Sequence, residues 1–490
     1  MQNITATPAP ITTPAPITTP APPTAPASPS AAAPSPPPTA AAPTEAGAIS
    51  ERVLPNGVRL LVESRPGART STFAVGVAAG AAQESKAGTA HLFEHLAFQQ
   101  TPSRPGNKIE QDIAVLGNAN AYTDFTRILY HITTPATEAR GGQDLISDIY
   151  LHPSTDPADL KEQQGVVEQE LRQRSLKEYQ AWEESNRLLM GDQPLSNDQG
   201  GSVKGVHSAV TQDLTDYLGK YFTGTNTVAM YSGDPAGLDL KLIEERLGAL
   251  PAGEKVDKSK LFTGYRPGAM VEVIPDESTP QVELSVVFPA AKTGDPNAPS
   301  TAILSTLLAG GGGSMLNERL RETDKLTGGV WAYNNAGPYY GALMLGASVE
   351  PGNVRKAVAA LGEELEKLRT GKVSDDDVSV AQRQTYNELL LAGAKPGASA
   401  MKAIESALEG EPVRTVGEQV AELKGLSAAQ IRETAAGLID WANVKIVARG
   451  AIADPGEIQA GLADAKVATQ LTNVPFDEKR YADRLVIDGE

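Results

Sequence analysis

The sequence predicts an α+β protein built from two copies of one unit of roughly 200 residues. Strand-like and helix-like segments follow one another, a polar stretch "PAGEKVDKSK" interrupts them from Pro251, and the same order of segments then restarts. The two halves also end alike, because "DLTDYLGKYFTGTNTVAMYSGD" and "QIRETAAGLIDWANVKIVARGA" are both typical of a helix, a turn and a strand. A duplicated unit is the economical explanation, and two unrelated α+β domains are the alternative.

Residues 1–48 have a composition that differs from the rest of the chain. They are almost entirely Pro, Ala, Thr and Ser, and they contain the near repeat "PAPITTPAPITTPAP". Such a segment cannot bury enough apolar surface to offset the entropy lost on ordering. We therefore expect a disordered tether, with a proline-motif ligand for a partner domain as the alternative.

The first domain is predicted over residues 49–251. "RVLPNGVRLLVES" predicts two strand pieces around an Asn56-Gly57 turn, and "STFAVGVAAGAAQE" predicts a further strand. "TAHLFEHLAFQQT" predicts a helix, whereas "ANAYTDFTRILYHITTP" alternates in the manner of strands. Long helical patterns follow over residues 144–152 and 157–189.

A linker is predicted over residues 252–267, a second domain over 268–475 and a C-terminal tail over 476–490. "AMVEVIPDESTPQVELSVVFPAA" predicts paired strands, and "STAILSTLLAGGGG" predicts a helix. The glycine run 310–314 lacks the Lys-Ser/Thr that a phosphate-binding loop needs after its last glycine. We expect this run to end a helix in a flexible turn, with contact to substrate as the alternative.

Composition excludes several classes of function. The formal net charge of -17 argues against a nucleic-acid binder, which needs basic patches. The absence of cysteine excludes disulfides, thiolate metal sites and a cysteine nucleophile. No apolar run approaches the ~20 residues that span a bilayer, so no transmembrane segment is expected. The tether and the lack of cysteine are compatible with a bacterial periplasmic protein.

Two of the five histidines lie four residues apart, in His91-Leu92-Phe93-Glu94-His95. On a helix these two positions share one face, so both imidazoles can reach one ion. Zn²⁺ accepts neutral imidazole nitrogen, and Glu94 can hydrogen-bond a metal-bound water and take its proton without being a ligand. The alternative is a surface helix that shows this pattern by chance.

A catalytic zinc site needs three protein ligands and one open position. The predicted helix "DLKEQQGVVEQELRQRS" offers Glu162, Glu168 and Glu170 as the third ligand. Spacing alone does not choose among these three glutamates, and any of them could instead be a solvated helix charge.

The pattern His-x-x-Glu-His is the inverzincin signature. Together with "GTAHLFEHLAFQQT", "GNANAYTDFTRILY" and "GVVEQELRQR", in this order, it makes the chain resemble the pitrilysin, or M16, family of zinc metallopeptidases. The resemblance runs from about residue 48 to about residue 475 and is greatest to M16B-like zinc-bearing subunits, such as the mitochondrial processing peptidase beta subunit and bacterial heterodimeric relatives. It implies two homologous LuxS/MPP-like α/β-sandwich halves arranged as a clamshell, with Zn²⁺ in the N-terminal half.

The resemblance also implies roles for single residues. It makes His91 and His95 zinc ligands, Glu170 the third ligand and Glu94 the general base.

Two further assignments rest on the same resemblance. The family usually has another glutamate seven residues before its third ligand, where this chain has Gln163, so the adjacent Glu162 is expected to take the accessory role. Asn120 and Ala121 match the family's edge strand, which pairs with the backbone of an extended substrate.

The second half departs from the family pattern in "LRETDKLTGGV", where active members often have "LREKRGLAYSV". Arg321 matches the family's catalytic arginine, but Gly328 replaces a tyrosine whose hydroxyl donates to the oxyanion. Losing one such donor typically costs about 10²–10³ in kcat. The resemblance therefore implies a heterodimer with a sister M16 subunit that carries the Arg/Tyr pair, unless Tyr333, Tyr339 or Tyr340 supplies the hydroxyl.

The predicted function is a zinc metalloendopeptidase subunit that hydrolyses extended peptides in an enclosed chamber. One alternative is a non-catalytic M16-like scaffold, which the intact His91, Glu94, His95 and Glu170 argue against. The other is a binding subunit with structural zinc, although structural zinc normally has four protein ligands.

Overall fold

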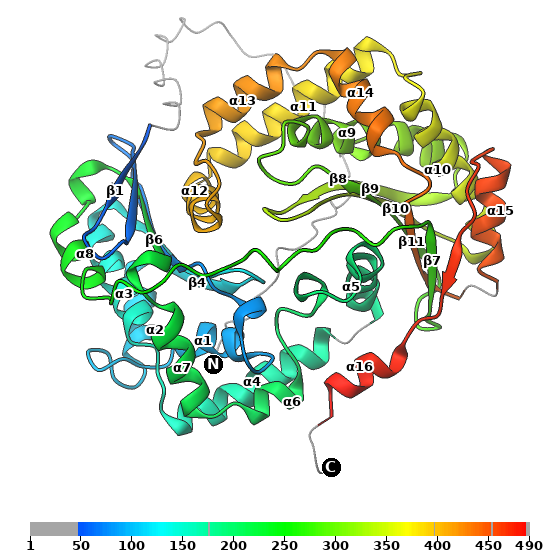
Figure 1. Cartoon of the computed structure of the whole chain (residues 1–490). Coiled ribbons are helices and arrows are strands. Elements are labelled where there is room, and N and C mark those ends of the chain that lie inside the picture. Colours follow the sequence, from blue (N-terminus) through cyan, green and yellow to red (C-terminus); the bar gives the residue numbers. More distant parts are fainter. Residues whose placement is uncertain (1–47, 175–176, 396, 452–453, 487–490) are drawn as a thin grey trace, which may run out of the picture. The chain divides into compact units, whose positions relative to one another are not determined.

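The computed structural model describes residues 48–174, 177–395, 397–451 and 454–486, so the predicted tether lies outside it apart from Ala48. Two six-stranded mixed sheets form the framework of this part of the chain (Figure 1). The strands of the first sheet are β1 (Ile49–Val53), β2 (Arg59–Ser64), β3 (Thr70–Val77), β4 (Asn118–Thr123), β5 (Ile128–Pro135) and β6 (Thr227–Gly233). Those of the second are β7 (Met270–Pro275), β8 (Val282–Ala290), β9 (Thr327–Ala336), β10 (Gly341–Val349), β11 (Lys445–Gly450) and β12 (Thr472–Val474).

The two sheets have equivalent topologies, which agrees with the predicted duplication. Their strand orders are β1-β2-β6-β3-β5-β4 and β12-β7-β11-β8-β10-β9. In each sheet a strand from late in its half is inserted between two earlier ones, parallel to β2 or β7 and antiparallel to β3 or β8. The mixed α+β fold in two similar halves is therefore confirmed.

One predicted pairing is wrong. The strands expected in "AMVEVIPDESTPQVELSVVFPAA" form as β7 and β8, but they are not paired with each other, because β11 lies between them. The pairing predicted around Asn56-Gly57 is confirmed, since β1 and β2 are antiparallel with Val53 opposite Arg59. Gly57 has φ of +96°, which favours glycine at that turn.

Helices cover both sheets. The first half contains α1 (Thr89–Leu96), α2 (Lys108–Leu116), α3 (Ala139–Leu151), α4 (Pro157–Arg174), α5 (Lys177–Met190), α6 (Val203–Ser208), α7 (Thr211–Tyr221) and α8 (Leu240–Leu247). The second contains α9 (Ala298–Ala309), α10 (Val354–Arg369), α11 (Asp375–Gly393), α12 (Ala398–Glu409), α13 (Val416–Gly425), α14 (Ala428–Leu438), α15 (Gly456–Asp464) and α16 (Glu478–Arg484).

As predicted, the glycine run follows the end of a helix, with Gly310 at the C-cap of α9. In the part of the chain that is described, no helix combines the length and the hydropathy needed to cross a membrane.

One helix of each half packs on the sheet of the other half. Helix α12 packs on β2, β3 and β6, and α5 packs on β7, β8 and β11. The reason for α12 lies in its sequence: Ala400, Ala403, Ile404, Ala407 and Leu408 form one apolar stripe at helical spacing and are buried. This exchange joins the two halves through apolar cores as well as through the linker.

The predicted C-terminal tail contains a docked helix. Tyr481 of α16 is buried, and its hydroxyl donates to Glu184 Oε1 of α5 at 2.8 Å. Arg484 pairs with Glu183 of the same helix at 2.8 Å. The last turns of the described chain are thus held against α5, and α5 directly follows α4 in the sequence.

Candidate metal centre

Helix α1 presents the two histidines because its other residues are anchored. Leu92, Phe93 and Leu96 are fully buried in the core under the first sheet. The Glu84 carboxylate accepts hydrogen bonds from the backbone N–H groups of Gly88 and Ala90, at 2.8 and 2.9 Å. Since the first N–H groups of a helix have no partner within the helix, Glu84 satisfies and fixes this end. Burial raises the pKa of Glu84 to about 7.

The structure brings Glu170 of α4 to the two histidines of α1. The imidazole centroids of His91 and His95 lie 4.8 Å apart, with ring planes at 87°. Glu170 Oε2 lies 3.4 Å from His91 Nε2, and Oε1 lies 3.7 Å from His95 Nε2. One ligand atom from each residue lies within 4.8 Å of those of the other two. Glu168 points to His207 instead, at 2.7 Å, so the geometry selects Glu170 among the candidate glutamates.

These three residues fit a zinc ion. His91 Nε2, His95 Nε2 and Glu170 Oε2 are buried, and none has a hydrogen-bond partner within the described residues. Buried polar atoms are normally satisfied, so three such atoms facing one another call for a shared ligand. Bonds of about 2.0–2.1 Å to a tetrahedral ion place neighbouring ligand atoms about 3.3 Å apart. The separations of 3.4 and 3.7 Å between the Glu170 oxygens and the two imidazole nitrogens are close to this value.

Electrostatics favour the neutral imidazoles that bind metals. Burial is the main cause that lowers the pKa of His91 well below its ordinary value, and it also lowers that of His95. Burial raises the pKa of Glu170, and the positive charge of Arg174 opposes this rise. Both rings are therefore uncharged at neutral pH, with lone pairs free for a cation.

Gln163, rather than Glu162, lies beside a histidine. Gln163 is buried, and its Oε1 is 3.2 Å from His95 Nδ1, whereas Glu162 is exposed. With the amide oxygen toward the ring, His95 carries its proton on Nδ1 and leaves Nε2 as the ligand atom. The sequence held a signal for this contact, because positions 163 and 170 are two helical turns apart and share a face.

Glu94 lies between the histidines in sequence and is itself 4% exposed. Burial raises its pKa to about 7, and a hydrogen bond from the Thr123 side chain opposes the rise. Thr123 is the last residue of β4, and its hydroxyl also lies 3.4 Å from the Ala90 carbonyl of α1. The end of β4 is therefore adjacent to the metal centre.

Strand β4, which contains Asn120 and Ala121, is the last strand of the first sheet. Within the described chain it pairs with β5 alone, with Asn120 opposite His131 and Ala121 opposite Tyr130. The Ala121 N–H donates to Asn120 Oδ1 at 2.9 Å. One backbone N–H of β4 is thus held by the side chain of the preceding residue.

Arg321 and Gly328 belong to the second half. Arg321 lies on the π-helical turn Asn317–Thr323; its side chain is 53% exposed and is 3.5 Å from Glu322. Gly328 is exposed near the start of β9, has no left-handed φ, and an added Cβ would meet no atom within 4 Å.

The three tyrosines named as alternative donors have other contacts. The Tyr339 hydroxyl donates to Glu409 Oε2 at 3.0 Å, and the Tyr340 hydroxyl accepts from Asn335 Nδ2 at 3.5 Å. The ring of Tyr333 stacks on Trp331 at 5.5 Å.

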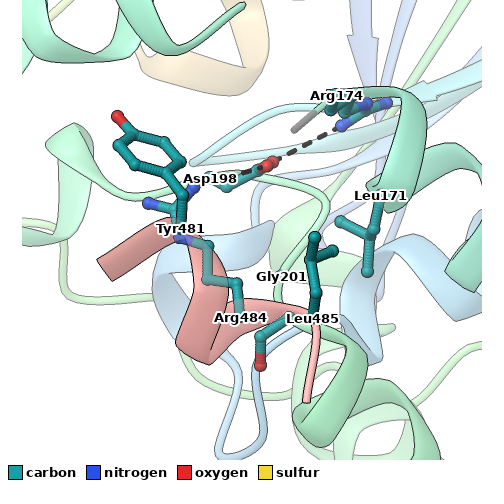
Figure 2. Close-up of a pocket in the computed structure, with 8 residues that line it drawn as sticks. Leu171, Arg174, Asp198, Gly201, Tyr481, Arg484 and Leu485 are labelled. Carbon is teal, nitrogen blue, oxygen red and sulfur yellow. Dashed lines mark ion pairs between the residues drawn. The ribbon is translucent and has the colours of Figure 1, made fainter. Parts of the chain in front are cut away.

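A small pocket lies on the next turn of α4 beyond Glu170 (Figure 2). Its lining residues come from α4, from the loop before α6 and from α16: Leu171, Arg174, Asp198, Gly201, Ser202, Tyr481, Arg484 and Leu485. Arg174 Nη1 is 3.5 Å from Asp198, which in turn is 3.8 Å from Arg484. The C-terminal helix is thereby connected to the helix that carries Glu170, a contact that the sequence did not predict.

Comparison with known protein families gives two matches along the chain. The family described as "Insulinase (Peptidase family M16)" matches residues 59–192, which include all four residues of the centre. The one described as "Peptidase M16 inactive domain" matches residues 209–385, so the two matches span more than half of the chain. The chain belongs to peptidase family M16.

Several relatives share this M16 architecture. The chain is 25% identical to a probable mitochondrial-processing peptidase subunit beta of Arabidopsis thaliana, over 69% of this chain and 66% of that one. It is 23% identical to an uncharacterized zinc protease of Streptomyces coelicolor, over 79% and 87%. A protease from Helicobacter pylori has the same fold, with a TM-score of 0.74 at 15% identity over 83% of this chain and 100% of that one. The periplasmic protease PqqL from Escherichia coli gives a TM-score of 0.73 at 18% identity over 89% of this M16 chain and 52% of PqqL.

We predict that this M16 chain binds about one zinc ion, and that His91→Ala and Glu170→Ala each lose it. Removing one of three ligands should weaken zinc binding by more than the roughly 10–100-fold typical of outer-shell changes. Elemental analysis after dialysis measures this loss. The matched control is Glu168→Ala, on the same helix but directed to His207. Full zinc in Glu170→Ala, or loss of zinc in Glu168→Ala, would contradict the assignment.

Proposed function

We propose that the chain is a zinc metalloendopeptidase subunit that hydrolyses extended peptides in an enclosed chamber. The observation that carries this proposal is the meeting of His91, His95 and Glu170 beside the buried carboxylate of Glu94. The facing atoms of the three residues are buried and have no hydrogen-bond partner in the part of the chain that the structure describes. Membership of the M16 family and the similarity to relatives named zinc proteases support it. A periplasmic location stays a prediction.

The residues of the chain have distinct tasks in this proposal. When bound, zinc would polarise the scissile carbonyl and lower the pKa of water toward about 7. Glu94 takes the proton of the attacking water on its carboxylate and delivers it to the leaving amide nitrogen. Gln163 holds the His95 ring, so that its Nε2 lone pair faces the ion.

Substrate binding is assigned to the free edge of β4. An extended peptide added beside Asn120 and Ala121 gains main-chain hydrogen bonds, which give affinity with little sequence selectivity. Strand β4 ends at Thr123, next to Glu94. A peptide on this edge therefore passes the carboxylate that takes the proton of the attacking water.

Two alternatives are less well supported. A binding subunit with structural zinc would be expected to offer four protein ligands, whereas His91, His95 and Glu170 are the one such cluster found among the described residues. A non-catalytic scaffold has no need of a buried base next to a metal site with three protein ligands. The family name "inactive domain" applies to residues 209–385, which lie outside the centre.

The proposal includes a sister subunit. Gly328 cannot donate a hydrogen bond from a side chain, and the Tyr339 hydroxyl already donates to Glu409. A relative from Saccharomyces cerevisiae, 24% identical over 80% of this chain and 87% of its own length, is named mitochondrial-processing peptidase subunit beta. A partner carrying the Arg/Tyr pair would supply the missing oxyanion donor.

We predict that Glu94→Gln keeps zinc and thermal stability but lowers kcat by about 10²–10⁴, the usual range for general acid–base catalysis. The amide keeps the shape of the side chain and cannot accept the proton. The measurement is hydrolysis of a fluorogenic peptide by metal-replete protein, with the exposed Glu110→Gln on α2 as the matched control. Wild-type rates in zinc-loaded Glu94→Gln would refute the mechanism.

We also predict that the isolated chain is slow and that a sister subunit with the Arg/Tyr pair raises kcat by at least about 10². Gly328→Tyr should recover part of this rate alone, because its backbone and surroundings accept a side chain. Gly329→Tyr is the matched control, since the next residue of a strand faces the opposite side of the sheet. Full activity of the isolated chain, lost in Tyr333→Phe, Tyr339→Phe or Tyr340→Phe, would show that no sister is needed.

A further inference from the structure

Helix α4 contains two glutamates that are each followed, four residues later, by an arginine: Glu168 by Arg172, and Glu170 by Arg174. Residues at this spacing share one face of a helix, and a glutamate placed before an arginine is the favourable order for an ion pair. The first two residues form that pair, with Arg172 Nη2 lying 2.6 Å from Glu168 Oε1. The same pairing is expected of Glu170 and Arg174.

Arg174 is paired differently. Its Nη1 lies 3.5 Å from a carboxylate oxygen of Asp198, in the loop before α6 (Figure 2). Among the described residues this is the ion pair that Arg174 makes, and Glu170 is left facing the two histidines. The arginine one turn beyond a metal-ligand candidate is therefore held by a residue outside the helix.

The charge of Arg174 nevertheless lies close to the metal centre. Burial raises the pKa of Glu170 and of Glu94, and the positive charge of Arg174 opposes both rises. Burial also lowers the pKa of the two histidines, and the same charge adds to that lowering. Because arginine stays charged in proteins and has a flexible stem, its guanidinium needs a fixed partner if it is to stay off Glu170.

Asp198 is itself held in place. Its Oδ1 accepts a hydrogen bond from the Gly200 N–H at 2.7 Å, and its Oδ2 lies 3.8 Å from Arg484 of α16. A Cβ added at Gly200 would lie 2.7 Å from Arg174 Nη1 and 3.1 Å from Asp198 Oδ1, so the absence of a side chain there leaves room for the pair. The side chains of Arg174 and Asp198 are 20% and 10% exposed, so salt screens this pair less than an exposed one.

An arginine paired with Glu170 would compete with the metal. The planar guanidinium can bind both oxygens of a carboxylate, and zinc needs an oxygen of the same carboxylate as its ligand. A positive charge beside that oxygen also repels a divalent cation. Without the charge of Asp198, the carboxylate on the same face of α4 as Arg174 is that of Glu170.

We propose that Asp198 is a positioning residue of the metal centre. It acts through Arg174, because by holding the guanidinium it keeps the Glu170 carboxylate free to bind zinc. This inference rests on the metal centre of the proposed function. It adds a residue that lies on neither of the two helices that supply the ligands.

The test measures the zinc Kd of the full-length chain by competition with a chromophoric chelator. Asp198→Asn removes the charge and keeps Oδ1 for the Gly200 N–H, so the loop should stay in place. This change should weaken zinc binding by about 10–100-fold, the range of outer-shell changes. Adding Arg174→Met should return the Kd to within about threefold of the wild-type value, because no guanidinium is left to occupy Glu170.

Three comparisons separate this role from a structural one. Arg174→Met alone should bind zinc as tightly as the wild type or more tightly. The matched control is Arg172→Met, at the arginine paired with Glu168, which should not restore zinc binding to Asp198→Asn. The melting temperature of the zinc-free protein is measured in parallel, since a pair that only stabilises the fold would lower that temperature and leave the zinc Kd unchanged.

A zinc Kd for Asp198→Asn within about threefold of the wild type would overturn the inference. So would a double variant that binds zinc as weakly as Asp198→Asn, or weaker binding by Arg174→Met alone. Failure of the proposed peptidase activity would appear separately, as absent hydrolysis by the zinc-loaded chain with its sister subunit, and would leave the comparison of Kd values valid.

Discussion

Two imidazoles and a carboxylate meet where α1 packs against α4, and their facing atoms are buried without hydrogen-bond partners among the described residues. In a folded protein such an arrangement is costly unless a cation joins the groups, because each buried polar atom has given up its contact with water. The rest of the first half holds this contact in place. Leu92 and Phe93 fix α1 to the core, Glu84 satisfies its first N–H groups, and Gln163 orients His95 from the neighbouring helix.

The same contact explains why other elements lie where they do. Strand β4 ends beside Glu94, so the free sheet edge and the proton-accepting carboxylate are neighbours. Arg174, one turn beyond Glu170, is paired with Asp198, and α16 packs on this loop and on α5. The exchange of α5 and α12 between the halves joins the metal-bearing half to the second half.

Local patterns predicted the histidine helix well, because the i, i+4 spacing and the apolar residues between are properties of one segment. Choosing Glu170 needed the resemblance to the family, since Glu162, Glu168 and Glu170 look alike in spacing. The structure separates them by direction: Glu162 is exposed, Glu168 binds His207, and Glu170 faces the histidines. Gln163 lacks the carboxylate of the family pattern, so the sequence did not predict its contact with His95, although an amide oxygen also accepts a hydrogen bond from an imidazole N–H.

Non-local features could not be predicted from the sequence. The pattern of β7 and β8 indicates strands, but it does not say that β11 will lie between them. The apolar stripe of α12 predicts burial, and only the tertiary structure shows that it is buried on the other half's sheet.

The central claim is that His91, His95 and Glu170 hold one metal ion between α1 and α4. Anomalous X-ray diffraction at the zinc edge, from crystals of the zinc-loaded chain, tests this claim most directly. The account predicts one anomalous peak between α1 and α4, with His91 Nε2, His95 Nε2 and a Glu170 oxygen at about 2.0–2.2 Å. A peak held by other residues, or none at this position in zinc-replete crystals, would contradict it.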